Sequence, residues 1–183
     1  VPQRYFDRYP LEDIVLPRLK ENDLEDVPPE GRAFAQARRS DLQTIMKAGK
    51  HRQAVRAYLA SITFADAQIG RVMDALAAGP HAENTVVVLW SDHGWHLGEK
   101  QHWRKFALWE RATRTPVIIA IPGGKAGVTC DRPASLLVIY PTLCDLAEIP
   151  PLEALDGRSL VPLLSDPNAE PNRVAITTHG RNN

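Results

Sequence analysis

The 183-residue chain carries 22 lysine and arginine residues and 22 aspartate and glutamate residues, so its formal net charge is +0 at pH 7. This neutral balance gives no support for nucleic-acid binding or for a polybasic membrane anchor. No apolar run approaches the roughly 20 residues that span a bilayer, and the length suits one domain with a sizeable core.

The first 50 residues differ in character from the rest of the chain. Residues 1–33 contain five prolines among many charged side chains, which predicts an extended connector with little regular structure. Residues 34–50 are polar with scattered apolar positions and predict a short helix. We therefore expect a proline-rich connector and short helix over 1–50, followed by an α/β domain over 51–183.

The clearest helix signal runs from residue 51 to residue 78. Apolar side chains recur there every three or four positions, as expected for one face of an amphipathic helix. Gly79 and Pro80 follow and supply a stop. A second helical pattern covers 136–148, with Pro141 in its first turn or at a kink.

Apolar runs at 85–91 and 115–121 predict two buried strands. Residues 156–164 predict a loop with a short turn, and 173–178 predict a further strand. The alternation of strands and helices predicts an α/β fold with a parallel sheet.

The polar residues directly after the first strand are the main candidates for a functional site. Ligands of open α/β sheets bind outside the carboxyl ends of strands, and Asp92 and His93 stand at such a position. An adjacent carboxylate and imidazole offer two ligands suited to a divalent metal. Zinc needs about four ligands and calcium about six to eight, so the others must come from elsewhere. The dipeptide alone equally fits a capping Asp92 and a hydrogen-bonding loop histidine.

The stretch that follows is rich in histidine, charge and tryptophan. Trp95 and Trp103 can wall a pocket into which cationic side chains reach, and a metal would add to its positive field. Such a pocket suits an anion, whereas the alternative is a solvated, charged loop. The titratable residues here are His96, Glu99, Lys100, His102, Arg104 and Lys105.

The pattern S-D-H-G-W-x-L-G-E at 91–99, followed by W-R-K at 103–105, resembles the metal-and-lysine segment of type I sulfatases, in the alkaline phosphatase superfamily. The likeness is greatest to the iduronate-2-sulfatase type and covers nearly the whole chain in order. It implies the later, central-to-C-terminal part of the catalytic domain: a portion of an alkaline-phosphatase-like mixed or parallel sheet sandwiched by helices, truncated at both ends. Further matching segments are 9–12, 58–71, 115–118, 140–143 and 156–160.

This resemblance implies a metal-dependent hydrolase of sulfate esters with a formylglycine nucleophile. Asp92 and His93 match the later pair of ligands for the family's divalent metal, usually calcium. Lys105 matches the lysine that contacts the sulfate, where a fixed ammonium suits the charge of the transition state. Trp95, His96 and His102 are expected to bind the substrate, a sulfated small molecule or carbohydrate. For the two histidines, the alternative is a position with no catalytic role.

The chain departs from the family pattern in the half of the site that attacks the substrate. It contains neither the C-x-P-x-R or S-x-P-x-R motif that yields formylglycine nor the early pair of aspartates. Cys130 and Cys144 lack that context and metal-site spacing, and Cys144 fits a small buried hydrophobe. We therefore expect a missing N-terminal half of the same protein to supply the nucleophile, and this chain alone to be inactive.

Two other functions are consistent with the same stretch. A related phosphodiesterase or phosphonate monoester hydrolase shares an Asp-His-Gly segment and a downstream lysine at similar spacing. A non-catalytic domain that keeps the scaffold is the third reading, and the joint presence of Asp92, His93 and Lys105 counts against it. The extended likeness at 58–71 and 156–160 favours the sulfatase.

Overall fold

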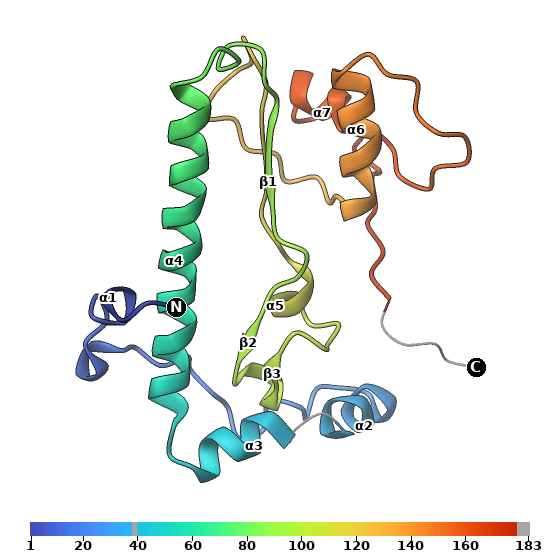
Figure 1. The fold of residues 1–183 in the computed structure, drawn as a ribbon. Helices are drawn as coiled ribbons and strands as arrows, with labels where there is room; N and C mark the ends of the chain where they lie inside the picture. Colours follow the sequence, from blue (N-terminus) through green and yellow to red (C-terminus); the bar gives the residue numbers. More distant parts are fainter. Residues whose placement is uncertain (38–39, 179–183) are drawn as a thin grey trace. The chain divides into compact units, whose positions relative to one another are not determined.

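The computed structural model describes residues 1–37 and 40–178, which form two compact units (Figure 1). The first unit comprises Val1–Glu83 and His93–Thr115, and the second comprises Asn84–Asp92 and Pro116–Asn183. The elements of the first unit are α1 (Gln3–Phe6), the 3-10 turn η1 (Leu11–Asp13), α2 (Pro29–Ala37), α3 (Ser40–Lys47), α4 (His51–Ala77), β2 (His96–Leu97), the 3-10 turn η2 (Glu99–Gln101), β3 (Trp103–Arg104) and α5 (Glu110–Thr113). Those of the second unit are β1 (Val87–Trp90), β4 (Val117–Ala120), the 3-10 turn η3 (Leu136–Val138), α6 (Ile139–Leu146) and α7 (Val161–Ser165).

Helix α4 organises the first unit and confirms the long helix expected from the apolar spacing, with Gly79 and Pro80 just beyond its end. Its Val55 is 2% exposed and shares a core with Ile14 of the N-terminal segment and Trp103 of β3. Burying one such side chain is worth about 1.5–3 kcal/mol. The N-terminal half of α4 therefore holds both the chain's first residues and the short β2–β3 ribbon.

The N-terminal segment is more ordered than its prolines suggest. It contains α1 and η1, and α2 begins at Pro29, where a proline suits the first helical position because no backbone N–H is needed there. Arg56 of α4 donates to the carbonyl of Phe6 at 2.9 Å, and Arg52 donates to the carbonyl of Ile14. The expectation of little regular structure over 1–33 therefore holds only for 14–28, which contains no helix or strand, and is wrong for α1, η1 and the start of α2. Residues 34–50 also contain two helical segments, the end of α2 and all of α3.

The second unit is built around a pair of antiparallel strands, not the parallel pair that the sequence predicted. Val87 of β1 lies opposite Ala120 of β4, and Trp90 lies opposite Val117. A parallel pair needs a crossover connection, usually a helix. The connection between these strands consists of the β2–β3 ribbon, the 3-10 turn η2 and the four-residue helix α5, so it contains no long crossover helix. The strands are also half-buried and not fully buried, with Trp90 48% exposed.

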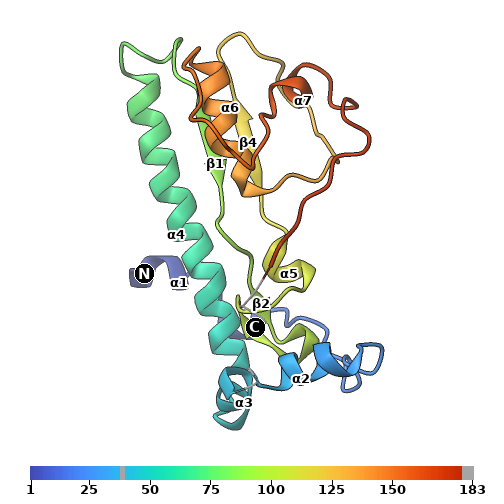
Figure 2. The same ribbon diagram turned by 90° about the vertical axis from the view of Figure 1, so that its right-hand side faces the viewer.

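The C-terminal half of this unit packs on β4 (Figure 2). A cluster of Val138, Leu160 and Leu163 is covered by Ile119 of β4 and by Ile139 at the start of α6. The helix expected over 136–148 is confirmed as η3 followed by α6, with Pro141 in the first turn of α6. The strand expected at 173–178 is wrong: this segment forms no strand in the structure.

The α/β class is confirmed, since both units combine helices with short strands. Across 1–37 and 40–178, no helix is both long enough and apolar enough to cross a membrane.

Candidate active site

The strand-end position of Asp92 and His93 follows from the pairing of β1 with β4. After β1 ends at Trp90, the N–H of Ser91 donates to the carbonyl of Pro116, directly before β4, at 3.3 Å, which extends the pairing of the two strands by one residue. Asp92 follows with an exposed side chain and is the last residue of its segment in the second unit, while His93 begins the later segment of the first unit. The two residues of the predicted metal pair therefore belong to different units.

Gly94 fixes the turn that follows the pair. Its N–H donates to the carbonyl of Ala112 at 2.7 Å, and a Cβ at this position would lie 2.1 Å from the carbonyl oxygen of Arg111. Only glycine allows the backbone to approach so closely. The Nδ1–H of His93 donates to the carbonyl of Gly94 at 2.9 Å. A neutral ring held in this way carries its lone pair on Nε2, the arrangement in which a second hydrogen bond orients a metal-binding histidine.

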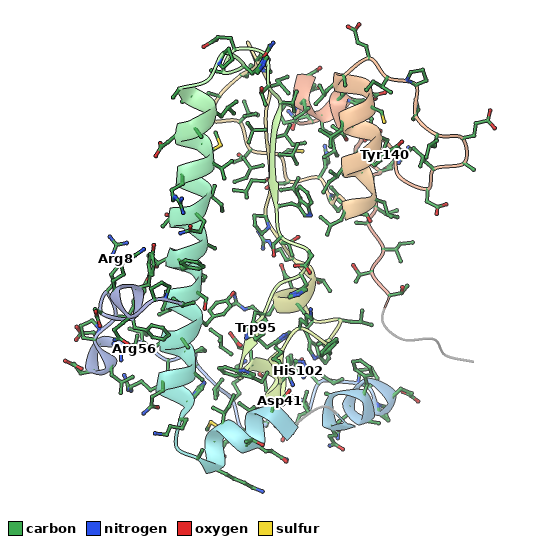
Figure 3. The ribbon with its side chains drawn as sticks, viewed as in Figure 1. Arg8, Asp41, Arg56, Trp95, His102 and Tyr140 are labelled. Carbon is green, nitrogen blue, oxygen red and sulfur yellow. The ribbon has the colours of Figure 1, made fainter. Side chains whose placement is uncertain are left out.

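A row of three rings runs from this turn to α4. The rings of His93 and Trp95 are 6.3 Å apart, and Trp95 stacks on Tyr58 of α4 with a centroid separation of 6.0 Å. Figure 3 shows Trp95 on the side of α4 that faces the β2–β3 ribbon. Burial, and then the charge of Glu99, raises the pKa of the Tyr58 hydroxyl. The row gives the half-buried Trp95 a fixed face, as a wall of a binding pocket requires.

His96 and His102, two of the predicted substrate-binding residues, lie together inside the first unit. They are 0% and 2% exposed, and their rings meet edge to face at 5.2 Å. The Nδ1–H of His96 donates to the carbonyl of Arg104 at 3.3 Å, while its buried Nε2 has no hydrogen-bond partner among the described residues. Burial lowers the pKa of His96. This burial favours, for both histidines, a role inside the loop over direct contact with substrate.

Lys105 follows β3 and is half-buried. Its ammonium lies 5.6 Å from the centre of the Phe106 ring, within the range of a cation–π contact. Its carbonyl accepts a hydrogen bond from Ala107 at 2.7 Å, which makes a tight turn directly after the lysine. The structure therefore brings His93 together with Trp95 and His96 together with His102, and it places Lys105 at the exit of the same loop.

Asp92 and His93 fit a divalent metal by the chemistry of their donors, an anionic oxygen and an imidazole nitrogen. They do not complete a coordination sphere: within 1–37 and 40–178 there is no group of three or more His, Cys, Asp or Glu residues arranged for a metal ion. The donor set is thus compatible with a metal site to which other ligands contribute.

Several residues that shape the site carried no signal in the sequence. His51, at the start of α4, donates from Nε2 to the carbonyl of Leu97 at 2.7 Å and packs edge to face on Trp103. Asp23 and Asp41 reach the loop at Lys100 and Arg104. These partners lie 46 to 77 positions away along the chain, so no local spacing connects them to the loop.

Comparison with known proteins places these residues in context. A family model described as "Sulfatase" matches residues 2–149. A sulfatase from Formosa agariphila is 41% identical over the whole chain, which corresponds to 36% of that protein. The mouse iduronate 2-sulfatase is 40% identical over 41% of this chain and 14% of its own length, in keeping with the expected iduronate-2-sulfatase likeness. The chain thus spans about a third of the length of the Formosa agariphila sulfatase.

Solved structures give the same result for the fold. The phosphonate monoester hydrolase from Silicibacter pomeroyi superposes with a TM-score of 0.76 at 27% identity, over 90% of this chain and 34% of its own. A protein solved in complex with D-glucosamine-2-N,6-O-disulfate superposes with a TM-score of 0.61 at 34% identity, over 64% of this chain and 24% of its own. The fold is therefore that of the alkaline-phosphatase-like hydrolases, covered in part.

Proposed function

Because the chain belongs to the sulfatase family, we propose that it forms part of a metal-dependent hydrolase of sulfate esters. The observation that carries this proposal is the strand-end pair Asp92 and His93 followed by Lys105, all inside the matched residues 2–149. The chain covers 36% of its Formosa relative. We accordingly propose that the formylglycine nucleophile and the other metal ligands come from parts of the protein outside this sequence.

In this proposal, the carboxylate of Asp92 and the Nε2 atom of His93 hold a divalent ion, with calcium as the expected metal. The bound ion would supply positive charge to the oxygens of the sulfate. The hydrogen bond from His93 Nδ1 to Gly94 supports the assignment, since it fixes the ring tautomer that metal binding needs. The adjacent Gly94 turn fixes the backbone directly after His93.

Lys105 is proposed to contact the sulfate through its ammonium. Sulfate transfer spreads negative charge over several oxygens, and a fixed cation stabilises that charge more in the transition state than in the substrate. A lysine serves here as a point charge, because no bidentate contact is required. The tight turn after Lys105 and its contact with Phe106 restrict the side chain before substrate binds.

Trp95 is proposed as a wall of the substrate pocket, held in place by Tyr58. The buried His96 and His102 are proposed to support the loop from within. Contact between His102 and the substrate, which the sequence predicted, stays a prediction. We propose a sulfated carbohydrate as the substrate class. Support comes from the neighbour solved with a disulfated glucosamine and from the likeness to an iduronate 2-sulfatase.

A second candidate, hydrolysis of a phosphonate monoester, is favoured by one observation. The superposition on the Silicibacter pomeroyi phosphonate monoester hydrolase covers 90% of this chain, more than the superposition on the disulfate complex. Both reactions place an anionic tetrahedral group against a metal and a cation, so Asp92, His93 and Lys105 would serve either one.

The test is made on the full-length protein after maturation of its nucleophile. We expect turnover of an aryl sulfate with a kcat/KM well above that for a phenyl phosphonate monoester. A reversed preference would replace the sulfatase assignment by the phosphonate hydrolase. Absence of both activities in a protein that carries formylglycine and metal would favour the non-catalytic alternative.

A further inference from the structure

The loop at 98–104, which leads into Lys105, contains a concentration of disfavoured backbone. Three of its non-glycine residues have positive φ angles: 52° at Lys100, 54° at Gln101 and 73° at Arg104. Residues other than glycine rarely adopt this left-handed region, and the conformation persists only where the surrounding structure holds it. The loop therefore needs an external restraint.

Lys100 is held by the N-terminal segment through both its backbone and its side chain. Its N–H donates to Asp23 Oδ2 at 2.8 Å, and its Nζ donates to the carbonyl of Asp23 at 2.7 Å. Nζ also lies 3.2 Å from Asp26 Oδ1 and 5.5 Å from the centre of the Trp109 ring. The hydrogen bond from Lys100 lowers the pKa of Asp26. Burial lowers the pKa of Lys100, but Asp26 and Asp23 raise it by more, so the net shift of the Lys100 pKa is upward.

The other two left-handed residues have partners of the same kind. Gln101 donates from Nε2 to the carbonyl of Glu21 at 2.9 Å, and Arg104 donates from Nε to Asp41 Oδ2 at 2.7 Å. Each strained residue of the loop is thus bound by a group 63 to 80 positions earlier in the chain. Figure 3 labels Asp41, which reaches this loop through its contact with Arg104.

The segment that binds the loop is itself anchored. Leu24 and Val27, which flank Asp26, are 4% and 6% exposed and pack with Ala35 of α2 and with Trp109. Trp109 comes five residues after the loop, so this cluster joins the segment that binds the loop to the chain that follows it. A rigid support of this kind can hold a strained loop in one conformation.

We propose that Asp23 is a positioning residue. It holds Lys100 and thereby keeps the loop at 98–104 in the conformation in which Lys105 can contact the sulfate. The catalytic half of this inference rests on the proposed function, while the restraint on the loop does not. Asp23 touches neither substrate nor metal in this scheme. Its effect on turnover passes through Lys105.

The experiment compares Asp23→Ala with the unmodified full-length protein by hydrogen exchange and by aryl sulfate kinetics. Loss of the acceptor for the Lys100 N–H should speed amide exchange over 98–104 by about tenfold, the scale of one hydrogen bond to a charged group. We expect kcat to fall by about the same factor while metal content stays constant. Asp23→Asn keeps an oxygen that accepts the Lys100 N–H, so it should restore most of the protection and also serves if Asp23→Ala does not fold.

Glu21→Ala is the matched control. It removes a carboxylate from the same segment but leaves the Glu21 carbonyl that Gln101 binds, so exchange and kcat should stay unchanged. A double-mutant cycle separates positioning from general stability. In a Lys105→Ala background, Asp23→Ala should cost little further turnover, because the group that it positions is already gone.

Three results would overturn the inference. Unchanged exchange over 98–104 in Asp23→Ala would show that Asp23 does not hold the loop. Faster exchange with unchanged kcat, or with fully additive losses in the cycle, would leave Asp23 a structural residue only. Absence of aryl sulfate turnover in the unmodified protein would count against the proposed function instead, and the exchange measurement would still decide whether the loop is held.

Discussion

The two ends of the segment from Asp92 to Lys105 are held in different ways. The near end is set by backbone contacts inside the segment 93–115: Gly94 donates to Ala112 and lies against Arg111. The far end is set by side chains and carbonyls of the first 41 residues, which bind Lys100, Gln101 and Arg104. The predicted metal ligands thus depend on close backbone packing, and the predicted sulfate-binding lysine depends on long-range polar contacts.

The largest expected effect is at the near end. Asp92→Ala removes an anionic metal ligand, so bound metal and aryl sulfate turnover should be lost together in the full-length protein. Elemental analysis and steady-state kinetics on the same preparation check both. Asp66→Ala, which removes an exposed carboxylate from α4, is the matched control. Normal metal content in Asp92→Ala would show that the strand end is not the metal site.

The next effect separates the chemistry of the far end from that of the near end. Lys105→Ala should lower kcat by about 10²–10³, the usual effect of removing one group that stabilises transition-state charge, while the bound metal stays near normal. Lys125→Ala removes an exposed lysine of the second unit and should change neither quantity. If Lys105→Ala keeps more than about half of the turnover, Lys105 has no electrostatic role in the reaction.

A substitution at Gly94 tests whether backbone packing sets the near end. The added Cβ of Gly94→Ala would lie 2.1 Å from the Arg111 carbonyl oxygen, and such overpacking costs about 1–3 kcal/mol of stability or more. Thermal unfolding should show a lower midpoint. The control is Gly70→Ala in α4, where nothing lies within 4 Å of the new methyl group; alanine is favoured in a helix by about 1 kcal/mol, so this variant should be no less stable. Equal midpoints for the two variants would contradict the close approach.

The same contrast explains what the sequence could predict. Helix α4 was expected at 51–78 and runs from His51 to Ala77, because a repeated apolar spacing and a Gly-Pro stop act within neighbouring turns. The positions of Asp92 and His93 at a strand end also follow from a local pattern. These features depend on residues close together in the sequence.

Strand direction and the loop restraint could not be predicted in this way. An apolar run such as 117–120 fits a parallel or an antiparallel neighbour, so its spacing alone does not predict the antiparallel pairing of β1 with β4. Asp23 and Asp41 look like ordinary surface acids in the sequence, and only the fold brings them to Lys100 and Arg104. Similarly, the prolines of the first 33 residues do not reveal that arginines of α4 bind this segment.

The smallest expected effect concerns His96, which joins the two ends of the segment through its hydrogen bond to the Arg104 carbonyl. Burial lowers its pKa from the usual value of about 6.5, opposed by the Arg104 carbonyl and by Glu99, and aided by Arg111. The unfolded chain therefore binds a proton more readily than the folded chain. The resulting stability is fully present above about pH 6.5 and is lost as the pH falls toward the folded pKa.

We therefore expect the unfolding midpoint of the full-length protein to fall between pH 7.5 and pH 5.5, and to fall less in His96→Asn. Asparagine keeps a donor for the Arg104 carbonyl but cannot acquire a charge in the buried site. An identical loss of stability in the unmodified protein and in His96→Asn would show that burial of this imidazole does not link the loop to pH. A smaller loss of stability in His96→Asn would show that the buried histidine, and not the surface charge as a whole, carries this part of the pH dependence.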